Sequence, residues 1–401
     1  MRQPKCTNKE KNQTGLRGRI LFVVNETYFF MTHRLPVARA MLAAGWEVHV
    51  AAPDDHVWAP VGFTVETLKT EGFHFHRIPL SRRGRNPFQE VRTLLAIWQL
   101  SRRLRPDIIH LLTIKPVIYG GLVARVARVP AMVSTITGLG QMFVESGLVT
   151  ALVRSLIIWL YRFALAHPNA RIIVQNSHDA EVLADPGALD RQRVRLIRGS
   201  GVNLEEFTRT TSPQGAAIVV LPARLIWEKG VREFVTAAEL LQQRGCDARL
   251  VLVGDTQTSN PRAVPSRQIE AWVADGIIEW WGRRTDMPEV FAQSAIVCLP
   301  TTYGEGVPKV LLEAAAAGRP IIASDIPGCR EVVRDGENGL LVPKSDPHAL
   351  ADAIFQLTHD PKLRAQMGQR GREIAESDFG EAQVVRQTLE IYDEVAPANS
   401  P

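Results

Sequence analysis

The chain has 401 residues, of which 45% are hydrophobic and 22% charged, and its formal net charge is +5. This composition is that of an ordinary globular protein and excludes a disordered or fibrous chain. The length exceeds what one average core can bury, so it predicts two domains.

Residues 1–17 are polar and contain no apolar stretch. They lack the apolar region of a secretory signal peptide, so we expect them to form a flexible tail. The four cysteines are scattered and form no Cys-x-x-Cys pair. A disulfide framework or zinc site is therefore not expected, and a reducing, cytoplasmic compartment is the default.

Charge is divided unevenly between the halves of the chain. Residues 1–200 hold 27 Lys and Arg against 14 Asp and Glu, or +13, and residues 201–401 hold 20 against 28, or −8. A basic half can attract nucleic acid, anionic lipid headgroups or phosphorylated substrates. The alternative is a solvated basic face without a partner.

Short apolar, β-branched runs alternate with helical stretches such as 35–45 and 87–106. In chain order the predicted strands are 19–25, 47–53, 75–80, 107–113, 131–137 and 171–176, then 216–224, 249–255, 277–282, 295–300 and 320–324. This alternation predicts an α/β fold with two doubly wound, Rossmann-like domains, whose parallel sheets are covered on both faces. Ligands of such folds lie beyond the carboxyl ends of the strands, so a ligand is expected in a cleft between the two domains.

The predicted domain junction is residues 197–215, where Gly, Ser, Thr and Pro concentrate. The expected organisation is a first domain over 18–200, a second over 201–380, and a C-terminal helix and tail over 381–401. Packing of that helix back on the first domain is one option.

Two cations, Arg224 and Lys229, follow the first strand of the second half, just before a helix. A helix N-terminus adds its dipole and free N–H groups to such charges, so this turn could bind a diphosphate. The alternative is two ordinary surface charges.

The stretch TTYGEGVPKVLLEAAAAGRP, residues 301–320, contains Glu305 and Glu313 on either side of a predicted helix start. Pro308 suits a first helical turn, and Gly306 lets backbone approach a ligand closely. Two acids suggest an acid–base pair or simply solvated side chains. Opposite a cationic turn, they are better interpreted as receptors for the hydroxyls of a nucleotide sugar.

Taken together, RLIWEKG (224–230) and YGEGVPKVLLEAAAAGRPIIASDIPGCREVVRDGENGLLVP (303–343) resemble the donor-binding half of glycosyltransferase family 4. That family is retaining and has the GT-B fold. The segment GSGVNLEEF (199–207) resembles its domain-junction segment, so the resemblance covers most of residues 199–345.

The resemblance implies roles for matching residues. Arg224 and Lys229 would hold the donor diphosphate and stabilise its charge, Glu313 would bind the nucleotide ribose, and Glu305 the transferred sugar. Further donor-binding positions are the backbone of Gly306, Val307 and Pro308 and, near the base, Arg283 and Thr285. The resemblance implies no metal and no other cofactor, and the sequence has no Asp-x-Asp placed for one.

The family's chemistry is retention of anomeric configuration by attack of the acceptor on the face that the diphosphate leaves. The departing phosphate assists deprotonation of the acceptor, and fixed cations stabilise the leaving charge. A covalent role for Glu305 as nucleophile is the second interpretation.

The N-terminal half resembles the family less closely. Many members have a His-x-His at the end of the fourth strand, where this chain has His110 but Leu112. The segments 33–53, 107–125 and 134–143 resemble the subgroup that elongates a sugar on undecaprenyl diphosphate, such as the bacillosaminyl-diphospho-undecaprenol N-acetylgalactosaminyltransferases. The acceptor-facing residues that this implies are His33, Arg34, His110, Thr113, Lys115, Gly138 and Gly140. For His33 a satisfied loop histidine is the alternative.

The segments 81–88, 101–106 and 147–167 place cations and apolar residues in the same half. Arg154 and Arg162 interrupt the last segment as a membrane span, so it is interpreted as an amphipathic helix on an anionic membrane. A helix buried against the sheet is the alternative. We expect peripheral association with the inner face of the cell membrane and no nucleic-acid partner.

The predicted function is transfer of a hexose or N-acetylhexosamine from a UDP-sugar to an undecaprenyl-diphosphate-linked saccharide, in surface polysaccharide or glycan biosynthesis. Two alternatives remain, a transferase with a soluble acceptor and a non-catalytic nucleotide-sugar-binding scaffold.

Overall fold

The computed structural model describes residues 16–53, 65–81, 86–138, 159–184, 190–210, 215–256 and 260–397. The chain divides into two compact units. Unit 1 spans Met1–Thr137, Glu145–Ile197 and Val385–Pro401, and unit 2 spans Gly138–Val144 and Arg198–Val384.

Unit 1 is built around one parallel sheet. Its strands are β1 (Gly18–Val24), β2 (Trp46–Ala52), β3 (His74–Arg77), β4 (Ile108–Leu112), β5 (Ala131–Ile136), β6 (Ala170–Val174) and β7 (Val194–Leu196). Its helices are α2 (Thr27–His33), α3 (Leu35–Ala43), α4 (Val65–Thr70), α5 (Pro87–Leu104), α6 (Ile114–Ala127), α8 (Ser177–Ala184), the 3-10 turn Arg191–Arg193, and the part of α16 (Glu381–Val395) from Val385 onward.

The strand order in unit 1 is β3-β2-β1-β4-β5-β6-β7, with every pair parallel. The central strands β4 and β5 are buried along their whole length, because helices cover both faces. The order reverses direction between β1 and β4. That reversal is the topological switch point, beside which doubly wound folds bind ligands.

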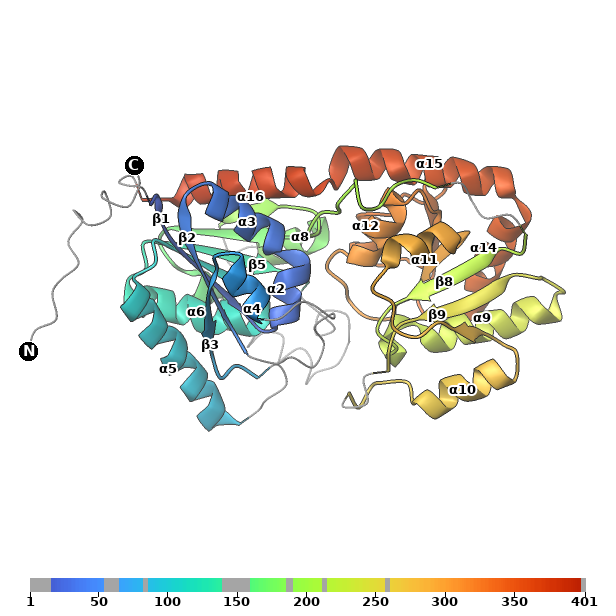
Figure 1. The fold of residues 1–401 in the computed structure, drawn as a ribbon, viewed down its shortest axis with the longest axis horizontal. Coiled ribbons are helices and arrows are strands. Elements are labelled where there is room, and N and C mark those ends of the chain that lie inside the picture. Colours follow the sequence, from blue (N-terminus) through green and yellow to red (C-terminus); the bar gives the residue numbers. More distant parts are fainter. Residues whose placement is uncertain are drawn as a thin grey trace, which may run out of the picture. The chain divides into compact units, whose positions relative to one another are not determined.

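Helices α5 and α6 lie on one side of the unit 1 sheet, and α3 and α16 lie on the other (Figure 1). Two glycines let α6 pack closely. A Cβ on Gly120 would lie 2.2 Å from Cδ2 of Leu111, and one on Gly121 would lie 2.4 Å from the carbonyl oxygen of Ala164. The pair therefore seats α6 between β4 and the helical residues 159–165.

Unit 2 repeats the architecture. Its strands are β8 (Ile218–Pro222), β9 (Arg249–Val253), β10 (Glu279–Trp280), β11 (Ile296–Leu299), β12 (Ile321–Ser324) and β13 (Gly339–Val342). Its helices are α9 (Val231–Gln243), α10 (Ser266–Ala274), α11 (Met287–Gln293), α12 (Lys309–Ala316), α13 (Pro327–Arg330), α14 (Pro347–His359) and α15 (Pro361–Asp378), with a 3-10 turn, η4, at Trp227–Lys229.

The unit 2 sheet has the order β10-β9-β8-β11-β12-β13 and is also parallel throughout. One apolar cluster includes Phe234 of α9 and Ile354 of α14, and a second includes Phe291 of α11 and Leu311 of α12. The two clusters are separate layers of core. The switch point falls between β8 and β11, which places the turns after these two strands side by side.

The two doubly wound sheets confirm the predicted fold class. Each predicted strand corresponds to an observed one, while β7 and β13 were not predicted. No helix in the described ranges is long and apolar enough to cross a membrane.

Candidate functional site

The turn after β8 carries the two predicted cations. Arg224 is exposed there, and Lys229 ends the 3-10 turn η4. Gly230 follows with φ of +79°, and a Cβ at this position would lie 2.0 Å from the carbonyl oxygen of Pro300. Only glycine combines this backbone conformation with so close an approach, so Gly230 holds the turn against the end of β11.

The loop after β11 is hydrogen-bonded to the same turn. The hydroxyl of Thr301 donates to the carbonyl oxygen of Glu228 at 2.9 Å, and the backbone N–H of Thr302 donates to that oxygen at 2.8 Å. The ammonium of Lys229 donates to Oε1 of Glu305. The structure therefore brings together Lys229 and Glu305, which the sequence predicted on separate turns.

Glu305 is held through one of its two carboxylate oxygens. Both Lys229 and the hydroxyl of Thr301, at 3.3 Å, contact Oε1. Oε2 has no recorded hydrogen bond within the described residues. That oxygen can accept a hydrogen bond from a hydroxyl-bearing ligand while Lys229 remains paired.

The backbone of Gly306 is packed against α13. A Cβ on Gly328 would lie 1.8 Å from the carbonyl oxygen of Gly306 and 2.6 Å from that of Glu305, so only glycine permits this approach. Gly306 and Pro308 are buried, and Val307 is half-buried. Gly138, which groups with unit 2, also meets this loop, because a Cβ there would lie 2.9 Å from the nitrogen of Gly306.

Glu313 lies on α12, which begins directly after this loop. Burial raises the pKa of its carboxyl to about 7, with Lys309 lowering and Glu206 raising it as smaller influences. The ammonium of Lys309 is 3.6 Å from Oε1 of Glu313. The carboxyl is therefore divided between its charged and neutral forms near neutral pH.

Arg283 and Thr285 are exposed in the loop between β10 and α11. This loop is fixed to the end of β9, because the backbone N–H of Gly254 donates to the carbonyl oxygen of Gly282 at 2.8 Å. The base-binding role predicted for Arg283 and Thr285 stays a prediction.

Sequence reasoning missed Glu228 and Thr301. Oε1 of Glu228 lies 2.8 Å from Nη1 of Arg262, and its Oε2 is buried with no hydrogen-bond partner in the described part of the chain. The available signal was adjacency, since Glu228 precedes Lys229 and Thr301 opens the stretch that contains Glu305.

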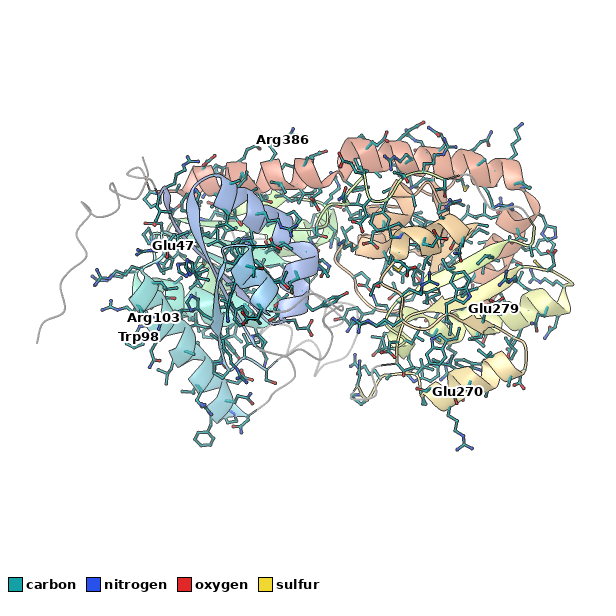
Figure 2. The ribbon with its side chains drawn as sticks, viewed as in Figure 1. Glu47, Trp98, Arg103, Glu270, Glu279 and Arg386 are labelled. Carbon is teal, nitrogen blue, oxygen red and sulfur yellow. The ribbon has the colours of Figure 1, made fainter. Side chains whose placement is uncertain are left out.

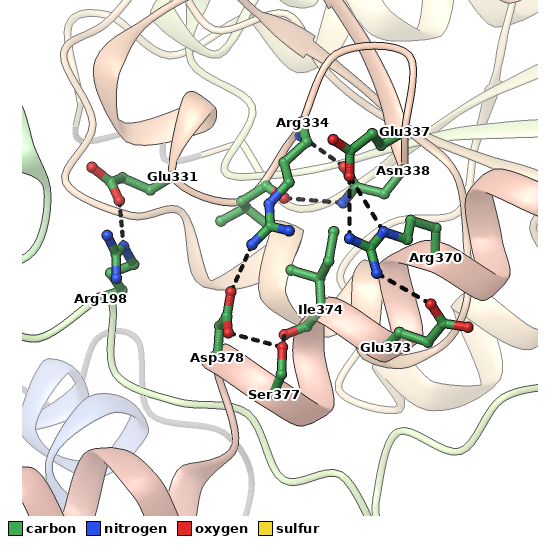
Figure 3. A network of polar contacts seen from close by, with 11 residues as sticks. Arg198, Glu331, Arg334, Glu337, Asn338, Arg370, Glu373, Ile374, Ser377 and Asp378 are labelled. Atoms are coloured by element: carbon green, nitrogen blue, oxygen red, sulfur yellow. Dashed lines mark hydrogen bonds and ion pairs between the residues drawn. The ribbon is translucent and has the colours of Figure 1, made fainter.

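A polar network supports the segment that follows α13 (Figure 3). Buried Asn338 accepts from the backbone N–H of Arg334 at 2.7 Å and donates to the carbonyl oxygen of Val332 at 3.0 Å. At one side Arg198, the first residue of this part of unit 2, pairs with Glu331 at 2.7 Å. These contacts fix the backbone behind α13 and, through Gly328, the loop of Glu305.

The switch point of unit 1 collects the predicted acceptor residues His33 and Arg34. The ring of His33 stacks on Phe29 with centroids 4.3 Å apart, and its Nδ1 lies 2.7 Å from the hydroxyl of Thr32. Arg34 joins α2 to α3 and is 2% exposed, with Nε and Nη2 lacking partners among the described residues. Burial lowers the pKa of its guanidinium to about 10, opposed by nearby Tyr392.

His110 is enclosed by protein side chains. Its ring is fully buried within β4, where Nδ1 lies 2.5 Å from the hydroxyl of Tyr392 on α16 and Nε2 lies 2.8 Å from the hydroxyl of Thr135 on β5. Burial keeps the pKa of His110 well below its usual value, and Arg34 lowers it further. Both ring nitrogens of His110 are thus engaged by protein side chains, and the acceptor role predicted for His110 stays a prediction.

Thr113 and Lys115 lie where β4 passes into α6. Thr113 has φ of +74°, a conformation that strains a β-branched residue, and its hydroxyl is buried without a hydrogen-bond partner among the described residues. Nζ of Lys115 lies 2.6 Å from Oε1 of Glu90 and 2.9 Å from the carbonyl oxygen of Ser81. Lys115 is thus an ion-paired side chain at this turn, where the sequence suggested a cation for the ligand.

Gly140 and most of the predicted amphipathic segment 147–167 lie outside the described residues. Within the described ranges no three His, Cys, Asp or Glu side chains are grouped to hold a metal ion.

In unit 2 the arrangement joins a fixed cation, two carboxyls and close-packed backbone at one switch point. Such a site can bind an anionic group together with hydroxyls.

Comparison with known proteins finds a family match for each half of the chain. The family described as "Glycosyl transferases group 1" matches residues 216–360, and "Glycosyl transferase 4-like" matches residues 19–177. The "Putative glycosyltransferase EpsD" of Bacillus subtilis is 30% identical over 395 residues, which are 93% of this chain and 96% of that protein.

A Campylobacter jejuni protein, N,N'-diacetylbacillosaminyl-diphospho-undecaprenol alpha-1,3-N-acetylgalactosaminyltransferase, is 28% identical over 375 residues, covering 90% of this chain and 95% of that protein. Among solved structures, Anabaena Alr3699/HepE in complex with UDP matches with a TM-score of 0.74 and 18% identity, covering 94% of this chain and 99% of that one. At that identity the structural match speaks for the fold alone.

Proposed function

Because the chain belongs to the group 1 glycosyltransferases, enzymes of class EC 2.4 that have the GT-B fold and use nucleotide sugars, we propose a specific transfer reaction for it. The enzyme moves a hexose or N-acetylhexosamine from a UDP-sugar to a saccharide carried on undecaprenyl diphosphate. The observation that supports the donor-binding part of the proposal is the ion pair between Lys229, in the turn after β8, and Glu305, in the loop after β11. That loop leads into α12, the helix that contains Glu313. Support for the acceptor half comes from the similarity to the Campylobacter jejuni transferase, which covers 90% of this chain.

In the proposed donor complex Arg224 and Lys229 bind the diphosphate. The first turn of α12, entered through Gly306, Val307 and Pro308, adds backbone N–H groups and its dipole to these charges. Glu313 accepts hydrogen bonds from the ribose, and the open Oε2 of Glu305 accepts one from the transferred sugar.

The reaction breaks the bond between the anomeric carbon and the diphosphate oxygen. A new bond forms between that carbon and the acceptor hydroxyl oxygen, on the same face of the sugar. The hydroxyl proton passes to the departing diphosphate, which leaves as UDP. Lys229 and Arg224 stabilise the negative charge that develops on the diphosphate, and this stabilisation is the main catalytic contribution of the protein.

Unit 1 binds the acceptor in this proposal. His33 and Arg34 lie at its switch point, and the strained Thr113 begins the neighbouring turn. Arg34 is suited to an anionic acceptor because its buried Nε and Nη2 have no partner among the described residues. A lipid-linked acceptor would place the enzyme peripherally at the inner face of the cell membrane.

The test is a donor and acceptor screen with the purified full-length chain. Labelled UDP-glucose, UDP-galactose, their N-acetylhexosamine counterparts and GDP-mannose are each offered with undecaprenyl-diphosphate N-acetylglucosamine or with the same sugar phosphate lacking the lipid. The proposal predicts one UDP-sugar transferred to the lipid-linked acceptor, with retained configuration by NMR of the released product.

Other outcomes would identify a different function. Equal rates on the lipid-free acceptor mean a soluble-acceptor transferase, and use of GDP-mannose alone overturns the choice of nucleotide. UDP binding by calorimetry without transfer to any acceptor means a binding scaffold. Lys229→Ala and Glu313→Ala test the site, because wild-type rates in both variants would mean that the donor is bound elsewhere.

A further inference from the structure

Helix α5 presents a row of large apolar side chains to solvent. Phe88 is 81% exposed, Val91 53%, Leu95 50% and Trp98 38%. Their spacings of three, four and three residues place them on one side of the helix. The opposite side is the one that packs on the sheet, where Ile97 and Leu100 are buried.

Burial of α5 against the sheet therefore leaves a second apolar stripe unexplained. A helix that needs only to cover a sheet has polar residues on its outer side. Here the outer side keeps two aromatic residues, Phe88 in the first turn and Trp98 in the second half of the helix. The helix is firmly built, since its cap residue Asn86 accepts a hydrogen bond from the backbone N–H of Phe88 at 3.0 Å.

Neighbouring elements continue the apolar character on the same side of the sheet. Val126 at the end of α6 is 70% exposed, and Trp159 and Phe163 are 59% and 50% exposed. Their rings stack with centroids 6.0 Å apart, and the guanidinium of Arg125 lies 5.0 Å from the centroid of Phe163. Helix α6 packs against α5 (Figure 1) and, at Gly121, against Ala164 of the helical residues 159–165, so the elements that carry these residues adjoin α5.

Elsewhere in the described residues, large exposed apolar side chains are isolated. They are Tyr28, Leu196 and Val273, each on a different element. Single exposed apolar residues are normal on soluble proteins, whereas a concentrated group marks an interaction surface.

The charge on α5 indicates the partner. Its exposed charged residues, with the residue that follows it, are Arg92, Arg102, Arg103 and Arg105. Figure 2 labels Trp98 and Arg103 on the outer side of this helix. The only acid of α5, Glu90, is engaged by Lys115 and the hydroxyl of Tyr119 at 2.6 and 2.8 Å. The exposed side is therefore apolar and purely cationic.

We propose that this face, the stripe Phe88, Val91, Leu95 and Trp98 with the arginines beside it, docks the protein on an anionic lipid bilayer. The aromatic and branched side chains enter the boundary between headgroups and acyl chains, while the long arginine stems let the guanidinium groups reach lipid phosphates. A bilayer offers both an apolar phase and negative charge. A second copy of the same face would bring like charges together.

Docking of this kind needs neither donor nor acceptor, so it can be tested separately from the proposed transfer reaction.

In the test, the full-length chain is mixed with vesicles of phosphatidylcholine, alone or with phosphatidylglycerol, in about 0.15 M salt. Flotation then separates bound from free protein. The expected result is binding to the phosphatidylglycerol vesicles and much weaker binding to phosphatidylcholine alone.

Two sets of variants test the face itself. The combined variant Phe88→Ser, Val91→Ser, Leu95→Ser and Trp98→Ser should bind anionic vesicles roughly a hundredfold more weakly. The variant Arg92→Gln with Arg102→Gln should lose most of the preference for anionic lipid. Matched controls are Leu196→Ser with Val273→Ser, and Arg386→Gln on α16, which should bind like the wild type.

Circular dichroism melting checks that the serine variant is folded. If it is not, single Phe88→Ser, at the most exposed position, still tests the stripe and should weaken binding severalfold. The proposal is overturned if wild-type protein does not float with anionic vesicles, or if folded stripe variants bind as tightly as the wild type. A wild-type dimer that the stripe variants convert to monomer in sedimentation velocity would instead assign this face to a second copy.

Discussion

The ammonium of Lys229 and the carboxylate of Glu305 form an ion pair between residues 76 positions apart in the chain. Both side chains are only 15% exposed, and each follows a different strand at the switch point of unit 2. The pair keeps a cation in place before any ligand arrives. Preorganised charge of this kind lowers a reaction barrier because it needs no reorganisation when the transition state forms.

Replacing Lys229 with Met should lower the transfer rate by roughly 10²–10³-fold, since one fixed donor to the leaving diphosphate is lost. UDP affinity should fall as well. Initial rates with labelled donor, together with calorimetry, measure both effects. Arg249→Met is the matched control, because it removes a paired cation, bound to Glu279 at 2.6 and 2.9 Å, from the start of β9. Wild-type activity in Lys229→Met would contradict the diphosphate role.

Glu305→Gln separates a binding role from a nucleophilic one. A glutamine keeps an oxygen for Lys229 but weakens the acceptor offered to the sugar, so transfer should fall by roughly 10–100-fold without being abolished. Intact-protein mass spectrometry during turnover should detect no glycosyl adduct. An adduct in the wild type, with complete loss of transfer in the variant, would make Glu305 the nucleophile.

Glu313 should make donor binding depend on pH. Burial raises the pKa of its carboxyl to about 7, and the ribose hydroxyls need the charged form as acceptor. UDP affinity should therefore fall about tenfold between pH 8 and pH 6, following the ionised fraction. Glu313→Gln should bind UDP weakly with little pH dependence. Calorimetry at the two pH values decides, and equal affinities in the wild type would argue against this contact.

The same raised pKa has a consequence for stability. A carboxyl whose pKa is higher in the folded protein favours folding fully below its unfolded value, near 4.5, and this contribution is lost as the pH rises through about 7. Glu313→Gln should therefore stabilise the protein relative to wild type at pH 8 more than at pH 5. Thermal melts at both pH values test the sign.

His110 and Tyr392 should matter for folding more than for catalysis. Burial lowers the pKa of His110, so the unfolded chain binds a proton more readily and stability falls as the pH drops below about 6.5. Tyr392→Phe should cost about 1–3 kcal/mol by leaving a buried ring nitrogen unsatisfied. Transfer at low temperature should stay within about threefold of wild type. A loss of kcat in a fully folded variant would restore an active-site role for His110.

Thr113→Gly separates backbone strain from function. Glycine adopts φ of +74° without strain, so the variant should gain about 1 kcal/mol in unfolding free energy. If the hydroxyl contacts the acceptor, KM for the acceptor should rise while UDP binding is unchanged. Denaturant unfolding and separate kinetics for each substrate measure the two effects. Greater stability with unchanged acceptor KM would assign Thr113 no binding role.

The strands and their parallel arrangement could be predicted because sheets buried on both faces need continuous apolar runs. The strands β7 and β13 could not. The strand β7, Val194–Leu196, has only three residues, and Arg195 interrupts its apolar run. The strand β13, Gly339–Val342, begins with a glycine whose missing Cβ lets it lie against the carbonyl oxygen of Ile321. Pairing with a neighbouring strand determines both.

The turns that bring Lys229 and Glu305 together could be located from the sequence, because glycines, cations and acids at strand ends carry local signals. The sequence could not predict which side chains, far apart in the chain, contact one another in the fold. The engagement of Lys115 by Glu90 and the enclosure of His110 by Tyr392 depend on which helices meet, and no local pattern reports that.

Unit 1 is discontinuous in the chain, and its helix α16 supplies Tyr392 to His110 and the carbonyl oxygen of Val395 to the amide of Asn169 at 2.8 Å. These residues are synthesised after all of unit 2. During translation the first 197 residues must therefore wait, with the surface beneath α16 uncovered, until unit 2 has left the ribosome. The order of synthesis and the order of completion are consequently reversed, and unit 2 should reach its native state first.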